Sequence, residues 1–224
     1  MSGANAATSQ AHKEQKIALA RSVLAKAEAA HGTRANTLGA ATLPVASELS
    51  FLLPHQGIKS GSVMGYEGAT SLLLALLSRP SQEGAWCAVV GFPHLNALAA
   101  AEAGVDLQKL ALIPHSGSES SRIVATLVDG FDLVVVGKET CENHLNTRAK
   151  RQINARVKER GATLFALGSW PETDVVMNSR IASWHGVGRG HGHLTKQDLI
   201  VGRGGRGAAQ RSLTAHLTLP LADA

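Results

Sequence analysis

One stretch of the chain carries most of the residue types that a phosphate-binding loop needs. Residues 61–77, GSVMGYEGATSLLLALL, contain glycines, a Thr-Ser pair and an apolar run with helical spacing. Loops of the pattern G-x-x-x-x-G-K-[ST] hold phosphates with backbone N–H groups, a lysine and a magnesium-binding hydroxyl. With Thr70 as the hydroxyl, Gly68 fits the pattern, but Val63 replaces the first glycine and Ala69 replaces the lysine. The loop has therefore lost the cation that the terminal phosphates require.

We interpret the stretch as a compact turn between a strand and a helix. Gly65 and Gly68 would give the turn backbone freedom, and Thr70 would cap the helix. Val63 belongs to the preceding strand, so the connection is too short to wrap around a triphosphate. The sequence therefore predicts a degenerate phosphate loop at Gly65, Gly68, Ala69 and Thr70, with no cofactor and no catalytic residue.

The acidic residue that helps such a loop to bind magnesium is also missing. In nucleotide hydrolases with such a loop, this carboxylate ends an apolar strand, but FDLVVVG ends at Gly137 and is followed by Lys138. Asp132 begins the same strand, which places it at the opposite edge of the sheet from bound ligands. We expect Asp132 to be a surface or capping residue.

The composition fits an ordinary globular protein. Of 224 residues, 44% are hydrophobic, 17% are charged and 4% are aromatic, with a formal net charge of +5. A core poor in aromatic residues suits a sheet that is buried on both faces. Cys87 and Cys141 are far apart, so we expect buried thiols rather than a disulfide or a metal site. No apolar run reaches membrane-spanning length, and we expect a cytoplasmic protein without a membrane contact.

Short apolar runs alternate with helical segments through the middle of the chain. Strands are expected at residues 62–64, 86–90, 110–113, 131–137 and 162–168, and helices at 70–77, 95–103, 120–128 and 145–160. This alternation predicts an α/β fold with a mostly parallel sheet flanked by helices.

The two ends of the chain follow other patterns, which suggests three segments. Residues 1–54 would hold an N-terminal helix, near 12–31, and a linker. Residues 55–170 would form the core, and 171–224 a β-rich extension of the same domain with antiparallel hairpin strands. We expect GRGGRG at 202–207 to be a flexible turn and Trp184 to pack inward.

Residues 86–117, WCAVVGFPHLNALAAAEAGVDLQKLALIPHSG, resemble a segment of RecA proteins. The residues that match are Ala103–Leu107 and Leu110. In RecA proteins an Asp-Ala-Glu-His string follows the first strand of this segment, and its glutamate activates water. This chain has Gly91–His94, GFPH, at those places, so only the histidine remains. The resemblance implies a RecA-like fold that does not hydrolyse nucleotides and is not an enzyme.

Within that superfamily the chain resembles the actinobacterial ImuA-type (ImuA-prime) proteins over about residues 53–219, including SWHGVGRGHGHL at 183–194. The resemblance implies an accessory or scaffold protein of SOS-induced, error-prone translesion DNA synthesis and mutagenesis. The partners that it implies are an ImuB-type inactive Y-family polymerase homologue, indirectly an error-prone C-family polymerase, and RecA. Two alternatives stay open, namely a residual ATP- or ADP-binding switch and a SulA-like division inhibitor.

Two basic stretches are candidates for binding DNA or a partner. The helix at 145–161 carries six cations against Glu159, and its apolar residues recur every fourth position. The C-terminal part carries six cations against Asp198. Such residues are either a solvated face or a sequence-independent contact with phosphates. The candidates are Arg148, Lys150, Arg151, Arg156, Lys158, Arg189, Arg203 and Arg206.

The N-terminal helix, residues 49–53 and a group of histidines are three further features that could bind a partner or a metal ion. Ile17, Val23 and Leu24 on the N-terminal helix would dock on a neighbouring protomer, as in RecA-like proteins, or pack on their own domain. Residues 49–53, LSFLL, would contact a partner or fill a local part of the core. His185, His191 and His193 lack nearby cysteines or paired carboxylates and are separated by glycines, so no metal site is expected.

Overall fold

The computed structural model describes residues 42–188 and 191–220. These residues belong to a unit that spans Ala40–Ala224. The predicted interaction helix with Ile17, Val23 and Leu24 lies outside the described residues, and so does Arg189. The segment boundaries expected at residues 54 and 170 stay predictions.

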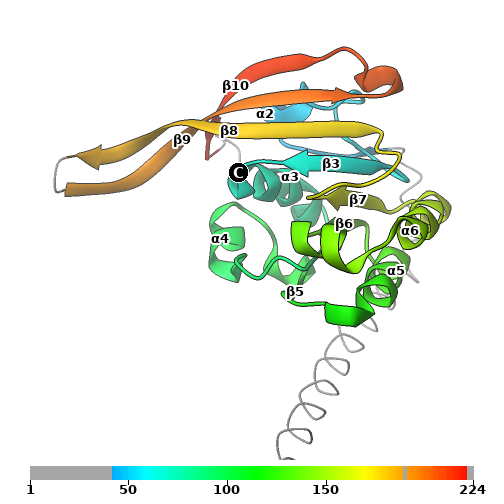
Figure 1. Ribbon diagram of the computed structural model, residues 1–224. Helices are drawn as coiled ribbons and strands as arrows, with labels where there is room; N and C mark the ends of the chain where they lie inside the picture. Colours follow the sequence, from blue (N-terminus) through cyan, green and yellow to red (C-terminus); the bar gives the residue numbers. More distant parts are fainter. Residues whose placement is uncertain (1–41, 189–190, 221–224) are drawn as a thin grey trace, which may run out of the picture. The chain divides into compact units, whose positions relative to one another are not determined.

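Eight strands form one mixed sheet in the order β10-β9-β8-β3-β7-β6-β4-β5 (Figure 1). Strands β3 to β8 pair in parallel with one another, and β8, β9 and β10 form antiparallel pairs. The α/β fold with a mostly parallel sheet and C-terminal antiparallel strands is therefore confirmed. The strands are β3 (Val63–Glu67), β4 (Cys87–Val90), β5 (Leu110–Ile113), β6 (Leu133–Val136), β7 (Thr163–Ala166), β8 (Val175–Gly188), β9 (His191–Gly205) and β10 (Leu213–Leu219).

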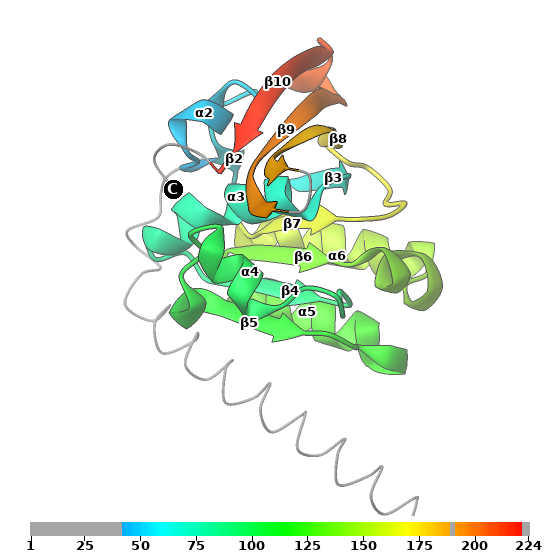
Figure 2. The ribbon, with the colours of Figure 1, turned by 90° about the vertical axis from the view of Figure 1, so that its left-hand side faces the viewer.

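Helices cover both faces of the sheet, as right-handed crossovers between parallel strands require. Figure 2 shows α3 and α4 on the near side of the sheet and α5 and α6 on the far side. Short 3-10 or π turns lie at Leu107–Lys109, Gly117–Glu119, Thr140–His144 and Gly207–Ala209. The helices are α3 (Thr70–Gln82), α4 (Ala97–Glu102), α5 (Ser120–Gly130) and α6 (Thr147–Arg160).

A small subdomain precedes the large sheet. Strands β1 (Thr42–Leu43) and β2 (Ile58–Lys59) pair antiparallel, and the one-turn helix α2 (Ser47–Ser50) lies between them in sequence. The segment LSFLL supplies Leu49, Leu52 and Leu53 to the core, whereas Phe51 is exposed. The interpretation of this segment as a core plug is confirmed.

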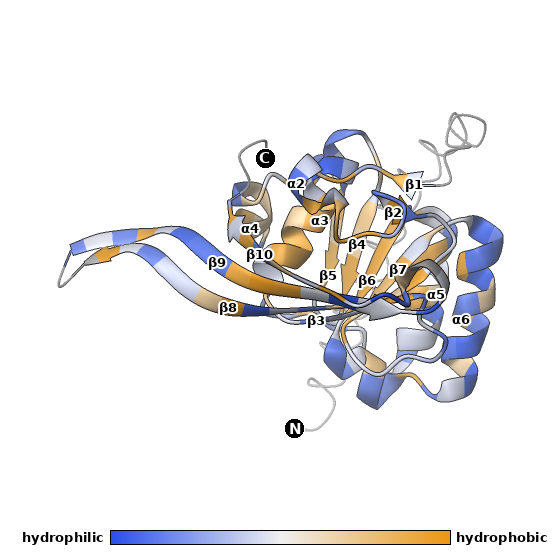
Figure 3. Cartoon of the chain, turned by 90° about the horizontal axis from the view of Figure 1, so that it is seen from above, coloured by the Kyte–Doolittle hydropathy of each residue, from blue (hydrophilic) through white to orange (hydrophobic). Residues whose placement is uncertain are grey.

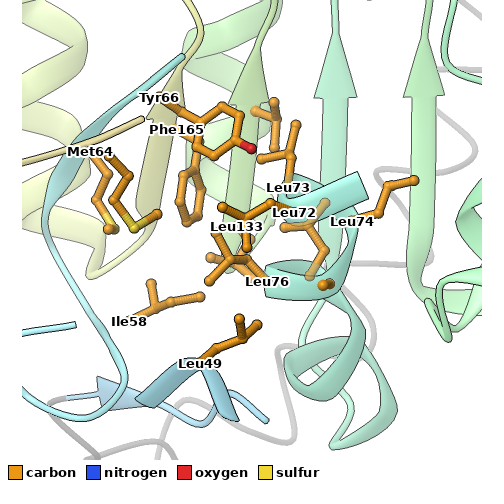
Figure 4. Packing of buried hydrophobic residues seen from close by; sticks show 14 of the residues in the cluster. Leu49, Ile58, Met64, Tyr66, Leu72, Leu73, Leu74, Leu76, Leu133 and Phe165 are labelled. Carbon is orange, nitrogen blue, oxygen red and sulfur yellow. The ribbon is translucent and has the colours of Figure 1, made fainter. Parts of the chain in front are cut away.

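The main core lies between α3 and the sheet. Leu72, Leu73 and Leu76 of α3 are fully buried, and they pack with Leu133 of β6 and Phe165 of β7 (Figure 4). Aliphatic side chains at i, i+1 and i+4 of a helix give a wide apolar face. The same cluster includes Leu199 and Val201 of β9, so the antiparallel strands are part of the core.

Three local expectations about glycine and capping were wrong. Gly65 lies inside β3 rather than in the turn, and Ala69, not Thr70, is the N-cap of α3. Gly202–Gly205 belong to β9 and pair with β8 instead of forming a flexible turn. Gly202 packs against the side chain of Asn178 across the ladder, so a missing side chain serves close strand packing here.

Strands β8 and β9 extend well beyond the sheet as a hairpin (Figure 1). β3 pairs with β8 only from Val175 to Asn178, whereas β8 and β9 pair along their whole length as far as Gly188 and His191. Figure 3 shows hydrophilic and hydrophobic residues interspersed along the projecting part. Trp184 lies in this part and is 52% exposed, so the expectation that it packs inward was wrong.

Candidate functional site

The degenerate phosphate loop is a two-residue turn, Gly68 and Ala69, between β3 and α3. Gly68 has φ +136°, a conformation that favours glycine. A Cβ atom at this position would overlap the backbone and hydroxyl of Ser179 on the neighbouring strand β8. The connection is therefore short, as predicted, and β8 occupies the space beside it; that it is too short for a triphosphate stays a prediction.

A ring of polar groups ties this turn to β8. The Ala69 N–H donates to Ser179 Oγ at 2.9 Å, and the Tyr66 hydroxyl donates to the Ala69 carbonyl at 2.5 Å. Ser179 Oγ lies 3.3 Å from the Tyr66 oxygen. Because the Tyr66 hydroxyl already donates to Ala69, Ser179 is the donor in this third hydrogen bond. Burial raises the pKa of Tyr66 to about 12, although the hydrogen bond from Ser179 opposes this shift. The backbone N–H that a phosphate would need at Ala69 is therefore already satisfied by protein.

The carboxyl ends of β4 and β6 form a second place where an α/β sheet could bind a ligand. The helix after β4 covers one face and the helix after β6 covers the other, which is the arrangement of a topological switch point. A Cβ at Gly137 would overlap the Gly91 carbonyl, and a Cβ at Gly91 would overlap Thr140 Oγ1. The backbone of Gly137 therefore packs closely on Gly91, and that of Gly91 on Thr140, at this edge of the sheet.

No carboxylate stands at the end of β6. Lys138 follows Gly137 and is exposed. Asp132 lies at the amino end of the strand, where its Oδ2 accepts from the Trp86 N–H at 2.8 Å. The prediction that Asp132 has a capping role at the far edge is confirmed. Lys138 would place a positive charge where a nucleotide-bound magnesium ion needs an anion.

The basic helix α6 is built as predicted but presents fewer cations than expected. Ala149, Ile153 and Val157 of α6 are buried, and so is Leu145 just before the helix. Lys150 is buried too, and its Nζ donates to the Ser169 carbonyl at 2.6 Å and lies 5.6 Å from the centre of the Trp170 ring. Lys150 is thus a structural residue, and its placement among the DNA or partner contacts was wrong.

Two further cations of α6 are neutralised by the neighbouring helix. Arg156 and Arg160 lie 3.4 Å and 3.1 Å from the same oxygen of Asp129 on α5. These pairs are half exposed and so contribute little stability, but they reduce the local positive charge. The exposed cations of α6 that form no ion pair with a described residue are Arg148, Arg151 and Lys158.

The exposed cations of α6 lie at opposite ends of the helix. Helix α6 starts beyond the carboxyl end of β6 and runs back to the amino edge, about 20 Å away. Arg148 and Arg151 lie on its first turns, whereas Lys158 lies beside Gly61 near the start of β3. Arg206 is exposed at the end of β9, and Arg203 is half buried with Nη2 3.3 Å from the Arg211 carbonyl.

The hairpin leaves the sheet at a cluster of polar groups around Asp198 of β9. Its carboxylate accepts from Ser183 at 2.6 Å, His185 at 2.5 Å and Thr218 at 2.7 Å. These hydrogen bonds hold the pKa of Asp198 well below its usual range. Three strands meet at this carboxylate, which fixes the direction in which the hairpin projects.

The histidines of the hairpin do not gather into a metal site. No group of three or more His, Cys, Asp or Glu residues within the described part of the chain could hold a metal ion. Likewise, within that part, no helix is long and apolar enough to cross a membrane. Cys87 and Cys141 are buried free thiols, and burial raises both pKa values, that of Cys141 to about 11.

Sequence reasoning missed the residues that close these sites. Ser179, Thr140 and Asp198 come from segments far from the loop in sequence, and each acts through a contact made only in the folded sheet. A serine within a β-branched run gives no signal of its own. For Ser179, the missing information was the pairing of β8 with β3.

Comparison with known proteins gives a family model and a similar protein. A family model described as the MT3502 N-terminal domain matches residues 51–172, which run from the end of α2 to the loop before β8. The uncharacterized protein Rv3395c of Mycobacterium tuberculosis is 36% identical over 126 residues. That alignment covers 55% of this chain and 60% of the relative, so the chain spans less than two thirds of the relative's length.

Proposed function

We propose that this chain, which belongs to the MT3502 N-terminal domain family, is a RecA-like accessory protein that neither binds nor hydrolyses nucleotides. The observation that carries the proposal is the closed turn between β3 and α3. Ser179 fills the space beside Gly68 and uses the Ala69 N–H, which removes a backbone donor that a phosphate-binding loop would need. Catalysis would require a lysine, a strand-end acid and a base, and all three are absent from the corresponding positions.

The order of elements supports the RecA-like interpretation. A buried strand, β4, is followed by a GFPH turn, a helix, an Asp106-capped turn and a parallel strand, β5. This is the series in which the chain resembles RecA proteins. Asp106 accepts from the Gln108 N–H at 2.9 Å, so it caps the turn.

We place the protein in ImuA-type function, as a scaffold in damage-induced, error-prone translesion synthesis in the cytoplasm. It would bridge an ImuB-type polymerase homologue and, through it, a C-family polymerase, with RecA or DNA as further partners. The exposed pair Arg148 and Arg151 on α6 is the candidate contact for a partner protein with an acidic segment.

Calorimetric titration with Mg-ATP and Mg-ADP at millimolar ligand tests the dead nucleotide site. We expect no heat of binding and no thermal stabilisation. Binding that stabilises the protein would overturn the closed-turn argument and favour the residual switch.

Induced mutagenesis tests the biological role. In a strain from which the gene has been deleted, the wild-type gene should restore damage-induced mutation frequency, and Thr70→Ala should restore it equally. The double variant Arg148→Glu/Arg151→Glu should reduce it and weaken capture of the ImuB-type partner. Full mutagenesis in the deletion strain would refute the role itself.

A further inference from the structure

The large sheet ends on one side at β10, which pairs with β9 alone among the described strands. Figure 1 shows β10 at the outer margin of the sheet, with no described helix or strand beyond it. An edge strand turns one row of its backbone N–H and C=O groups away from its neighbour, where a further strand can pair with them. The seven residues Leu213–Leu219 therefore offer a template for strand pairing.

The sequence of β10 does not protect this edge. Natural edge strands are commonly shielded by charged residues, by proline, by a bulge or by their shortness. Residues 212–222 contain no Asp, Glu, Lys or Arg, and Pro220 comes only after the strand has ended. The register of β10 on β9 runs without a shift from one end of β10 to the other. The opposite edge strand, β5, is only four residues long and follows directly after Lys109.

The side chains of β10 alternate between the two faces of the sheet. The odd-numbered ones lie in the hydrophobic core cluster or pack against it, namely Leu213, Ala215, Leu217 and Leu219. The even-numbered ones are exposed on the opposite face, namely Thr214, His216 and Thr218. A strand that continues the sheet must therefore present apolar side chains on the core face and small polar ones on the other face.

A second copy of β10 meets these requirements, because the strand is nearly palindromic. LTAHLTL read backwards is LTLHATL. An antiparallel copy that pairs all seven residues places His216 opposite His216 of the second copy, threonine opposite threonine, and Leu213 opposite Leu219. On the core face, the small Ala215 lies opposite the larger Leu217. Such Thr–Thr and apolar cross-strand pairs stabilise antiparallel sheets.

We propose that two copies of this chain form a dimer by antiparallel pairing of their β10 strands, which joins their sheets into one. A two-fold axis perpendicular to the sheet at His216 relates the copies and keeps both core faces on the same side. The contact uses the β10 edge of each copy, so assembly stops at two. This dimer goes beyond the proposed function and does not depend on a role in mutagenesis.

Sedimentation velocity of the full chain over a concentration series tests the dimer. We expect a reversible monomer–dimer equilibrium with a dissociation constant of about 1–100 µM, because one strand pair is a small interface. His216→Lys should raise this constant at least about tenfold, since it sets like charges opposite each other. The matched control is Gln152→Lys, which adds the same charge at an exposed position on α6 and should change the constant less than about twofold.

Cysteine crosslinking tests the register of the two strands. In His216→Cys the two new thiols face each other across the axis, with Cβ atoms about 5 Å apart, so a disulfide needs only a small adjustment. Thr214→Cys is exposed on the same face of the same strand, but its two copies are offset by four residues, about 13 Å along the strands. Mild oxidation should therefore link only the first variant covalently, and the native thiols Cys87 and Cys141 are buried.

The dimer is excluded if the wild-type protein stays monomeric at about 100 µM, which would leave the edge to a segment of another protein. Equal crosslinking of the two cysteine variants would show random collision instead of the proposed register. A folded His216→Lys protein that dimerises as well as the wild type would place the interface elsewhere. Assemblies that keep growing with concentration would contradict a closed pair. All of these outcomes leave the nucleotide and mutagenesis tests unaffected.

Discussion

Gly68 lies in close contact with β8 at the turn between β3 and α3. Its φ of +136° and its contact with Ser179 leave no room for a side chain. Gly68→Ala should therefore cost about 2 kcal/mol or more of unfolding free energy, from backbone strain and overpacking together. Urea unfolding measures this cost. The matched control is Gly204→Ala on β9, where a Cβ would meet nothing within 4 Å, and its stability should change by less than about 1 kcal/mol. Equal effects at both positions would contradict the tight contact.

The hydrogen bonds among Tyr66, Ala69 and Ser179 can be tested by pH titration, because Tyr66 is the only tyrosine of the chain and its absorbance can be followed alone. Burial raises its folded-state pKa to about 12, above the ordinary value of 10.0. The protonated hydroxyl therefore contributes stability that is fully present below pH 10 and is lost as the pH rises toward 12. Phenolate absorbance should titrate near pH 12 or appear together with unfolding. A reversible titration near pH 10 with the fold intact would show that Tyr66 is not buried as described.

At the scale of the element, α6 separates what sequence can predict from what it cannot. The four-residue spacing of Leu145, Ala149, Ile153 and Val157 predicts the helix and its buried stripe, and both are confirmed. The same pattern assigns Lys150 to the solvent face, because a charged residue is ordinarily exposed. In the fold, the loop before β8 covers that side of α6, and the Ser169 carbonyl of this loop accepts a hydrogen bond from Lys150 Nζ. Such a contact depends on tertiary structure and leaves no periodic signal.

Asn154 belongs to the same contact between α6 and the loop. Its Oδ1 accepts from the buried Trp170 Nε1 at 2.7 Å, and its Nδ2 donates to the Pro171 carbonyl at 3.0 Å. Asn154→Ala would leave a buried indole N–H without a partner, so unfolding free energy should fall by about 1–3 kcal/mol. Gln152→Ala, exposed on the same helix, is the control and should change stability by less than about 0.5 kcal/mol. If both variants unfold at the same urea concentration, the loop is not anchored through Asn154.

The root of the hairpin should respond to acid. Hydrogen bonds to Asp198 lower its folded-state pKa, so its contribution to stability is present above the ordinary pKa of an aspartate and is lost as the pH falls below it. Asp198→Asn should accelerate amide exchange of residues 183–197 at neutral pH, where the wild-type carboxylate is charged. Asp106→Asn, in the turn before β5, should leave this exchange unchanged. Identical exchange in wild type and Asp198→Asn would remove Asp198 as the anchor of the hairpin.

At the scale of the whole described unit, the sheet has two parts that are built differently and were not equally predictable from the sequence. From β5 to β3 the strands are short and parallel, β4, β6 and β7 are buried on both faces, and their alternation with helices made them predictable. From β8 to β10 the strands are long and antiparallel, and the glycine-rich sequence suggested turns where strands of 14 and 15 residues stand. A glycine in a paired strand and a glycine in a turn look alike in sequence. Only the partner strand distinguishes them.

This division predicts that the outer part of the hairpin, residues 185–196, can be removed without loss of the fold. Replacing residues 185–196 by an Asn-Gly turn keeps the pair Trp184–Gln197 and the buried Leu199 and Val201, and it supplies the turn that a two-residue hairpin prefers. Because the removed side chains that the structure describes are exposed, the unfolding free energy measured in urea should change by less than about 1 kcal/mol. A shortened protein that does not fold would show that residues 185–196 are part of the folding unit.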